Sequence, residues 1–407
     1  GEERGRARAM GTQRVQDLLA QAGSISEQKG SVEAFCLAID AAVEPGSATA
    51  QQDCALVVEK VLSTEVSQWV CRDALQYLVP ALRKLSKDVH EKVAERILEL
   101  VQPRAANFEE QVTVVREQLS ELLEQREQWC RAAEVLSGIN VDSHNNRTFD
   151  DRYKLQKCLK IATLFLRDGK PQRAENYVNR AAFLLGVCND DPALVLQHKS
   201  CYARVVDHKC KFLEAALRYY EVSNFSAKGR ELDPATVLLD GSEVGKLKES
   251  ALRDAVTCAV LANAGPQRSR VLASLYKDER CVKLEGGVYP ILHKVYMERI
   301  LGPAEVASFS GMLQSHQGGE KVEHAVIEHN LQSASRLYRN ISFEELGRML
   351  GVEPVRAEKA AARMIVEGRM GGQIDQVDNF IYFASSGEGS GEVESWDQQI
   401  RSLCQDV

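Results

Sequence analysis

The sequence lacks a long apolar run, because its most hydrophobic stretch, near residues 256–262, is shorter than the roughly 18 residues of a membrane span. Aromatic residues are few, at 6%, and 27 Gly and 10 Pro in 407 residues fall below the roughly 12% of average composition. These absences exclude membrane-spanning, collagen-like and low-complexity chains. The 44% of hydrophobic residues are mostly Ala, Leu, Val and Ile, which favours helices over a β-sandwich.

A disulfide framework and a strong excess of one charge are also missing. The 11 cysteines are odd in number and include no C-x-x-C pair. The chain has 51 Lys and Arg against 58 Asp and Glu, for a net charge of −7. That balance opposes a surface for nucleic acid or anionic membrane spread over the whole molecule. The sequence therefore predicts a reduced, soluble, intracellular protein that binds neither nucleic acid nor membrane.

Motifs for catalysis are absent as well. A zinc hydrolase needs H-E-x-x-H or H-x-H, and the eight His form neither pattern. His324 and His329 lie five residues apart on a predicted helix, so they point about 140° away from each other. His324 lies on the apolar stripe of that helix, where a packed core histidine is the better interpretation. Residues 241–246, G-S-E-V-G-K, are too few for a phosphate-binding loop. We expect no enzyme activity, no cofactor and no metal site.

Helical periodicity is what the chain does have, and it repeats at intervals of 41 to 42 residues. Three helical segments are expected to begin at residues 129, 171 and 212, and each carries a small residue three positions further on: Ala132, Ala174 and Ala215. Such an Ala lets the two helices of a hairpin approach closely. Two helices per repeat of about 40 residues predict a right-handed α-solenoid of TPR- or HEAT-like hairpins, which usually acts as a scaffold. We place it at residues 31–200, after a loose arm at residues 1–30.

A different pattern follows in residues 341–385. Ser342 and Glu345 form a capping box for a short helix, and Pro354 opens a second one. Two short strands, Q-I-D-Q-V and F-I-Y-F, then flank a turn. Helix, turn, helix and hairpin predict a winged helix. It ends a domain that we place at residues 201–385, whose helical part is expected at residues 201–340.

The charge of the winged helix decides what it is expected to bind. Seven acidic residues outnumber five basic ones between residues 341 and 383, and this net charge of −2 would repel phosphate. We therefore predict protein contact, carried by Phe380, Ile381, Tyr382 and Phe383. Their strand is expected to form a free sheet edge that a neighbouring hairpin can extend.

The end of the chain carries a second predicted interface. Residues 386–392 form a Gly- and Ser-rich acidic linker. Beyond it, apolar residues step by three and four in a heptad seam: Val393, Trp396, Ile400, Leu403 and Val407. This pattern predicts a short helix over residues 393–407 that joins a bundle of helices from partner subunits.

Longer blocks of sequence resemble the PCI family, whose members build the proteasome lid, the COP9 signalosome and translation initiation factor three. Among them are A-G-P-Q-R-S-R-V-L-A-S-L-Y-K-D-E-R-C at 264–281, A-V-I-E-H-N-L-Q-S-A-S-R-L-Y-R-N-I at 325–341 and E-G-R-M-G-G-Q-I-D-Q at 367–376. In amino-acid sequence, these blocks are most similar to the signalosome members of the family. The resemblance covers residues 100–404 approximately; it is loose before residue 100 and absent before about residue 30.

The resemblance implies a mainly α fold in which the solenoid is followed by a winged-helix module and a C-terminal bundling helix. It implies a non-catalytic scaffold of the complex that removes a ubiquitin-like modifier from cullins, in the cytoplasm and nucleus. The implied partners are other PCI subunits, the metalloprotease-type subunit pair, and the cullin-RING ligase, approached by the N-terminal solenoid. Two alternatives stay open: a PCI subunit of the proteasome lid, and a winged-helix regulator that binds nucleic acid.

Overall fold

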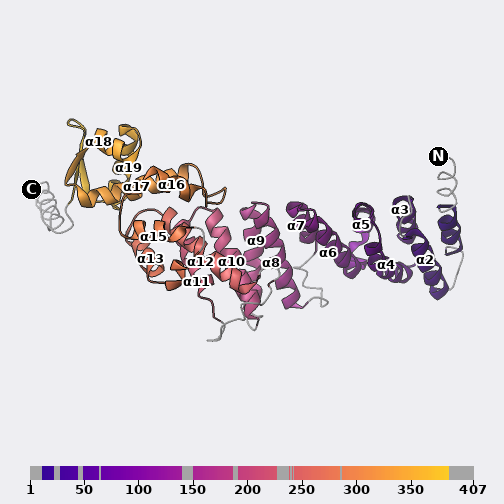
Figure 1. The fold of residues 1–407 in the computed structure, drawn as a ribbon. Helices are drawn as coiled ribbons and strands as arrows, with labels where there is room; N and C mark the ends of the chain where they lie inside the picture. The colour runs from indigo at the N-terminus through magenta and orange to yellow at the C-terminus, as the bar shows by residue number, and fades with distance from the viewer. Residues whose placement is uncertain are drawn as a thin grey trace, which may run out of the picture. The chain divides into compact units, whose positions relative to one another are not determined.

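Helices make up nearly all the regular structure of the chain, as the sequence predicts (Figure 1). The computed structural model describes residues 12–22, 28–44, 49–63, 66–139, 150–186, 191–226, 238, 241, 243–284 and 287–384. Contacts divide the chain into two units, Gly1–Cys188 and Asn189–Val407. In the described residues no helix combines the length and the apolar character that crossing a membrane requires.

The first unit is a succession of helices, most of which pack against the next. It begins with a helix at residues 12–22 and continues with α2 (Gln28–Ala42), α3 (Ala50–Val61), α4 (Gln68–Ala81), η1 (Leu82–Lys84), α5 (Lys87–Val101), η2 (Gln102–Asn107), α6 (Glu109–Gln125), α7 (Trp129–Ser137), α8 (Asp151–Arg167) and α9 (Pro171–Leu185). Early in the unit, helices also contact the next but one, as α2 does with α4. This packing is typical of stacked helical hairpins.

The second unit contains the remaining helices and all the described strands. Its elements are α10 (Pro192–His208), α11 (Phe212–Ser223), α12 (Val244–Leu261), α13 (Pro266–Tyr276), α14 (Glu279–Val282), α15 (Val288–Tyr296), α16 (Pro303–Ser310), α17 (Glu320–Leu337), β1 (Asn340–Ser342), α18 (Phe343–Leu350), α19 (Pro354–Val366), β2 (Gly372–Asp375) and β3 (Phe380–Phe383). Helix α12 is buried on nearly all sides and lies at the centre of the larger core, packed by α11, α13, α15 and α17.

The predicted repeat starts are confirmed, because α7, α9 and α11 begin at residues 129, 171 and 212. The three Ala residues three positions further on are fully buried where each helix meets its neighbours. The turn before each helix has the same geometry. One residue in it has a positive φ: 58° at Glu127, 74° at Gly169 and 60° at Cys210.

The following amide in each turn closes the preceding helix with a hydrogen bond that reaches back five residues. The N–H groups of Gln128 and Lys170 donate to the carbonyls of Leu123 and Phe165, both at 2.9 Å. The N–H of Lys211 donates to Val206 O at 3.2 Å. This is the Schellman arrangement, which satisfies carbonyls at the end of a helix and reverses the chain. The repeat is therefore encoded in the turns as well as in the buried Ala.

Two expected boundaries need correction. Residues 12–22 are helical, and Val15, Leu19 and Ala22 are buried along one face, so the expected loose arm is wrong for this segment. A stripe of only three buried apolar residues in an 11-residue segment is too short to stand out by periodicity. The boundary predicted after residue 200 falls inside α10, whereas the units divide between Cys188 and Asn189.

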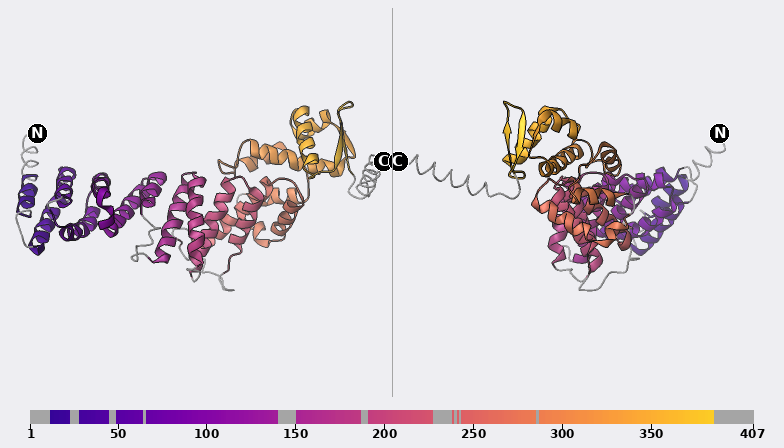
Figure 2. Two further views of the ribbon diagram at one scale, coloured as in Figure 1. Left: turned by 180° about the vertical axis from the view of Figure 1, so that it is seen from behind. Right: turned by 60° about the vertical axis from the view of Figure 1, so that its left-hand side comes forward.

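The winged helix ends the second unit, and the views of Figure 2 show its two longer strands as a projecting hairpin. Its sheet has the order β1-β3-β2, with both pairings antiparallel. Helices α18 and α19 pack on it around a core that includes Leu346, Ala361, Met364 and Ile381. Ser342 Oγ accepts the N–H of Glu345 at 3.3 Å, so the predicted cap of α18 is present. Helix α17 contributes Leu331 and Ala334 to the same core.

Candidate functional site

The F-I-Y-F strand, β3, is the central strand of the winged-helix sheet. Ile381 lies opposite Ile341 of β1 and opposite Ile374 of β2. The expectation that this strand forms a free edge is therefore wrong. It failed because β1 has only three residues directly before a helix, too few to show the alternation that predicts a strand.

The four predicted interface residues on β3 divide between the two faces of the sheet. Ile381 and Phe383 are buried in the winged-helix core, where they cannot contact a partner without unfolding. Phe380 is half-buried and Tyr382 is 44% exposed, and their ring centroids lie 6.4 Å apart. A protein contact carried by Phe380 and Tyr382 stays a prediction.

The free edges of the described sheet are β1 and β2. Gly371 O accepts the N–H of Ala384 at 3.1 Å, and in an antiparallel pair the bonding direction alternates along the strand. Gln373 and Asp375 therefore bond toward β3, whereas the backbone groups of Gly372 and Ile374 point away from it. The edge of β2 can thus accept another strand.

The hairpin beside this edge is held rigidly. Asp375 Oδ1 accepts the N–H groups of Val377 at 2.9 Å and Asp378 at 3.2 Å, which fixes the turn. Gln376 Nε2 donates to Glu358 Oε1 at 2.9 Å and joins the turn to α19. Val377 at its tip is 89% exposed. A single exposed apolar side chain is common on protein surfaces, so Val377 matters here only as a neighbour of the free edge of β2.

A buried carboxylate fastens the winged helix to the helical part of the second unit. Glu328, in the middle of α17, is fully buried and accepts two hydrogen bonds from Arg369, at 2.5 and 2.8 Å. Arg363 and His324 lie at 3.4 Å from the same carboxylate, and the N–H of Ala264 donates to it at 3.4 Å. Burial by itself raises the pKa of Glu328, but the Arg369 guanidinium and its hydrogen bonds outweigh burial and hold the pKa below its usual value.

The next two residues of α17 hold the segment between α15 and α16. His329 is buried, and its Nε2 lies 2.9 Å from Arg299 O. Asn330 Oδ1 accepts the N–H of Leu301 at 2.8 Å, while its Nδ2 donates to Leu301 O at 3.1 Å. Burial and the nearby Arg268 lower the pKa of His329 to about 4, so it is neutral at physiological pH.

The expectation that His324 is a packed core histidine is wrong. His329 is the buried, hydrogen-bonded one, whereas His324 is half-exposed beside Glu328. Over the residues with described coordinates, no three or more His, Cys, Asp or Glu side chains are grouped so that they could hold a metal ion.

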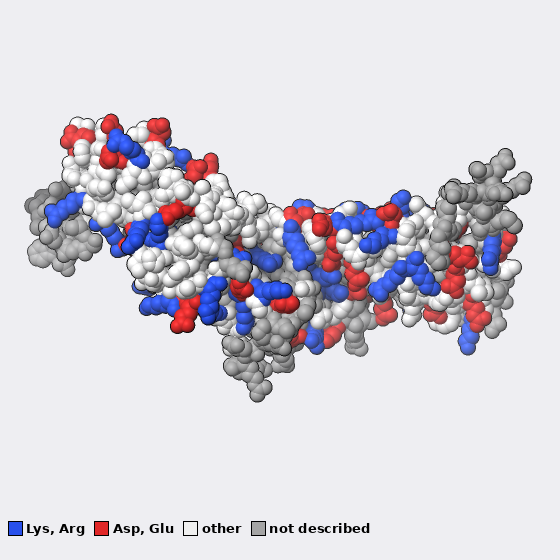
Figure 3. All heavy atoms as spheres, in the orientation of Figure 1, with Lys and Arg blue, Asp and Glu red and all other residues white. Residues whose placement is uncertain are grey.

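Charges on the winged helix are of both signs, as its surface at the upper left of Figure 3 shows. Four of its five basic residues are ion-paired within the described chain. Arg348 pairs with Glu345, and Arg356 with Glu323 at 3.0 Å. Arg363 and Arg369 both face Glu328. A helix whose guanidinium groups are already neutralised offers little attraction to phosphate.

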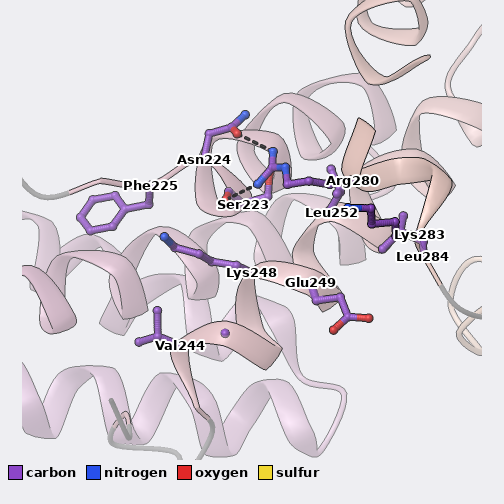
Figure 4. Close-up of a pocket in the computed structure, with 11 residues that line it drawn as sticks. Ser223, Asn224, Phe225, Val244, Lys248, Glu249, Leu252, Arg280, Lys283 and Leu284 are labelled. Carbon is purple, nitrogen blue, oxygen red and sulfur yellow. Dashed lines mark hydrogen bonds between the residues drawn. The ribbon is translucent and has the colours of Figure 1, made fainter. Parts of the chain in front are cut away.

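The second unit also has an open cleft lined by α11, α12, α14 and the residues that follow them (Figure 4). Arg280 donates there to Ser223 O at 3.0 Å and to Asn224 Oδ1 at 2.5 Å, and pairs with Asp278 at 2.6 Å. The guanidinium is thus committed to joining α14 to the end of α11.

The predicted C-terminal interface residues lie outside the described residues. They are Val393, Trp396, Ile400 and Leu403, together with the expected linker at 386–392 and helix at 393–407. Sequence reasoning missed Glu328 and Arg369, whose contact joins residues 41 positions apart. One signal was available, because Glu328 lies one helical turn after His324, which is on the apolar stripe of a predicted helix.

The architecture defines a class: stacked helices followed by a winged helix are the features of PCI-domain proteins. Two family models match the chain. The model described as "PSMD12/CSN4, N-terminal" matches residues 18–228, and the PCI domain model matches residues 306–385.

Similar curated proteins are each named COP9 signalosome complex subunit 4. The Arabidopsis thaliana protein is 42% identical over 400 residues, covering 96% of both chains. The Drosophila melanogaster protein is 42% identical, covering 86% of this chain and 82% of its own. The Dictyostelium discoideum protein is 35% identical, covering 97% and 95%. The chain belongs to the COP9 signalosome subunit 4 family.

Proposed function

We propose that this chain is a non-catalytic scaffold subunit of the COP9 signalosome. The observation that carries the proposal is the similarity to signalosome subunit 4 proteins along 96% of both chains in the Arabidopsis comparison. The fold supports it, because stacked helices and a winged helix present long surfaces for other subunits. A proteasome-lid subunit is not favoured, since these relatives carry the signalosome name. Nucleic-acid binding is not favoured because the winged-helix arginines are paired internally.

The proposal extends to the activity and the location of the complex. In it, a metalloprotease-type subunit removes the ubiquitin-like modifier from cullins, and this chain positions its partners without taking part in the chemistry. The N-terminal helices approach the cullin-RING ligase, and the complex works in the cytoplasm and nucleus.

We place the contact with a neighbouring PCI subunit at the edge of β2. Its outward N–H and C=O groups at Gly372 and Ile374 can continue a sheet, and Val377 and Tyr382 flank it with exposed apolar surface. Strand addition of this kind gives affinity through main-chain hydrogen bonds and specificity through side chains.

The substitution Ile374→Pro tests this contact, because it removes the outward N–H of the edge. Ile374→Ala is the matched control, since it removes the same side chain and keeps the N–H. We expect Ile374→Pro to weaken binding to the other PCI subunits about tenfold more than Ile374→Ala, measured by biolayer interferometry with reconstituted subunits. Equal weakening by both substitutions, with both variants folded by circular dichroism, would place the contact elsewhere.

The C-terminal seam is the second proposed contact. A helix of about four turns is marginal alone, because nucleation is costly and short helices fray. Ile400→Asp combined with Leu403→Asp should therefore leave the thermal unfolding of the isolated chain unchanged and reduce its incorporation into the complex. Unchanged incorporation together with a large loss of stability would show that the seam packs on its own chain.

A further inference from the structure

Ion pairs, most of them between a helix and the next but one, neutralise many of the carboxylates in the first unit. They form a ladder in which each acidic residue meets a basic one 35 to 40 positions later in the chain. Its members are Glu59–Arg96, Glu91–Arg126, Glu95–Arg131, Glu117–Lys157, Glu124–Lys160 and Glu134–Arg173, at 2.5 to 2.9 Å. Against this background, carboxylates left without a cation stand out.

Three such carboxylates lie together on α2 and α4. Glu33, Asp40 and Asp73 form no ion pair with any Lys or Arg of the described chain. The only basic residues on these two helices are Lys29 and Arg72, and Arg72 Nε donates instead to Asn107 O at 2.9 Å. Lys29 lies one helical turn before Glu33 but forms no ion pair with it, so none of the three carboxylates has a cation partner within the described chain.

Large apolar side chains are exposed among these carboxylates. Leu37 on α2 is 61% exposed, and Trp69 and Tyr77 on α4 are 47% and 42% exposed. Steps of four and three residues place Leu37 between Glu33 and Asp40 on one side of α2. Steps of four place Asp73 between Trp69 and Tyr77 on one side of α4.

The two helix sides form one surface, because α2 packs against α4 and Tyr77 Oη donates to Asp40 Oδ2 at 2.9 Å. We define the acidic-aromatic face by six residues, Glu33, Leu37, Asp40, Trp69, Asp73 and Tyr77. The half-buried thiol of Cys36 lies near all three carboxylates of this face. Burial, and then Asp40, Asp73 and Glu33 in turn, raise the pKa of Cys36.

We propose that the acidic-aromatic face binds a segment of a partner protein that carries Lys or Arg side chains beside an apolar one. The cations neutralise the three carboxylates and lie over the rings of Trp69 and Tyr77, as cations do on aromatic faces. The apolar side chain of the partner packs on Leu37. Charge complementarity selects this occupant, since an anionic membrane or a nucleic acid would be repelled. The proposal extends the scaffold role and does not depend on it, because the face lies wholly within one unit of this chain.

The chain itself contains one competing segment. Residues 1–11 include three Arg, but they also include two Glu and only one large apolar residue, Met10. They match the face less well than a partner segment with more basic residues and a Leu or Ile. Deletion of residues 1–11 distinguishes a face occupied by this segment from a face that is free for a partner.

The test measures binding of a short fluorescent peptide, in which Lys and Arg alternate with Leu, to the full chain by anisotropy. The test variant combines Glu33→Gln, Asp40→Asn and Asp73→Asn. The matched control combines Glu59→Gln, Glu95→Gln and Glu134→Gln, which change the net charge equally on the same unit but remove carboxylates that are already paired. We expect the test variant to bind about tenfold more weakly and the control to bind as the unaltered chain does.

Four further results would bear on the proposal. Equal weakening by the two triple variants would mean that the peptide responds to net charge alone. Tighter binding by about tenfold after deletion of residues 1–11 would mean that the chain covers the face itself. Leu37→Ser should weaken peptide binding in low and in high salt, because an apolar contact is not screened by salt. Phe183→Ser, which changes an 84% exposed residue of α9, is the control and should leave peptide binding unchanged in both conditions. Absence of binding by the unaltered chain, with thermal unfolding confirming that it is folded, would contradict the proposal outright.

Discussion

At the scale of single residues, the second unit depends on a few buried polar groups. Glu328, His329 and Asn330 are consecutive on α17. Glu328 holds Arg369 of the winged helix, and the other two hold Arg299 and Leu301 in the segment between α15 and α16. Their roles could not be predicted from sequence, because each partner is 29 to 41 residues away. The periodicity of α17 could be predicted, and it identifies which positions face inward without saying what they meet.

Removing the Glu328 charge should destabilise the second unit. Glu328→Gln leaves Arg369, whose side chain is only 15% exposed, with the more exposed Glu367 as its remaining carboxylate, and breaking a buried pair of this kind costs about 3 kcal/mol. Glu345→Gln is the control, since its pair with Arg348 is exposed and should contribute less than about 1 kcal/mol. Urea unfolding measures both changes. A cost for Glu328→Gln no larger than that for Glu345→Gln would contradict the assigned role.

The low pKa of His329 predicts a loss of stability in acid. Its pKa is about 4 in the folded chain against about 6.5 when unfolded, so the unfolded state binds the proton first as the pH falls. The stabilisation is complete above pH 6.5 or so and is lost between about 6.5 and 4. His329→Gln keeps a donor for Arg299 O and removes the titration, so its unfolding free energy should fall less over this range. Parallel pH profiles for the two proteins would exclude His329 as the titrating group.

At the scale of elements, the hairpins of the repeats were the most predictable part. A buried Ala and a helix start recur at α7, α9 and α11, and both signals are local in the sequence. Strand β1 and the helix at 12–22 could not be predicted, because each is too short for its period to be distinguished from chance. The same missing strand is why β3 was expected at an edge, since pairing partners decide which strand is central.

The repeated turns give a prediction with a built-in comparison. Glu127 and Gly169 occupy the same position with positive φ, 58° and 74°, and only Gly adopts this conformation without strain. Glu127→Gly should raise the free energy of unfolding by about 0.5 to 1 kcal/mol, and Gly169→Ala should lower it by about 1 kcal/mol. A Cβ on Gly169 would meet no atom within 4 Å, so its effect reports the backbone alone. Thermal denaturation checks both, and changes of the same sign would contradict the shared geometry.

At the scale of the whole molecule, the described part of the chain carries two proposed partner surfaces. The edge of β2 and the acidic-aromatic face belong to different units, so each can be altered without disturbing the other. Substitutions at one surface should therefore remove one partner and leave the rest bound. Composition and periodicity predicted this scaffold character; the residues that carry each contact required the pairing and burial seen in the structure.

The central claim, that this chain is a scaffold of the COP9 signalosome, is tested most directly by purifying the tagged full chain from its own cells and identifying its stoichiometric partners by mass spectrometry. We predict the other signalosome subunits, including the metalloprotease-type pair, together with cullins in smaller amounts. The Ile374→Pro variant should recover fewer PCI subunits than Ile374→Ala. Proteasome-lid subunits and ATPases as the stoichiometric partners, with signalosome subunits missing, would contradict the account.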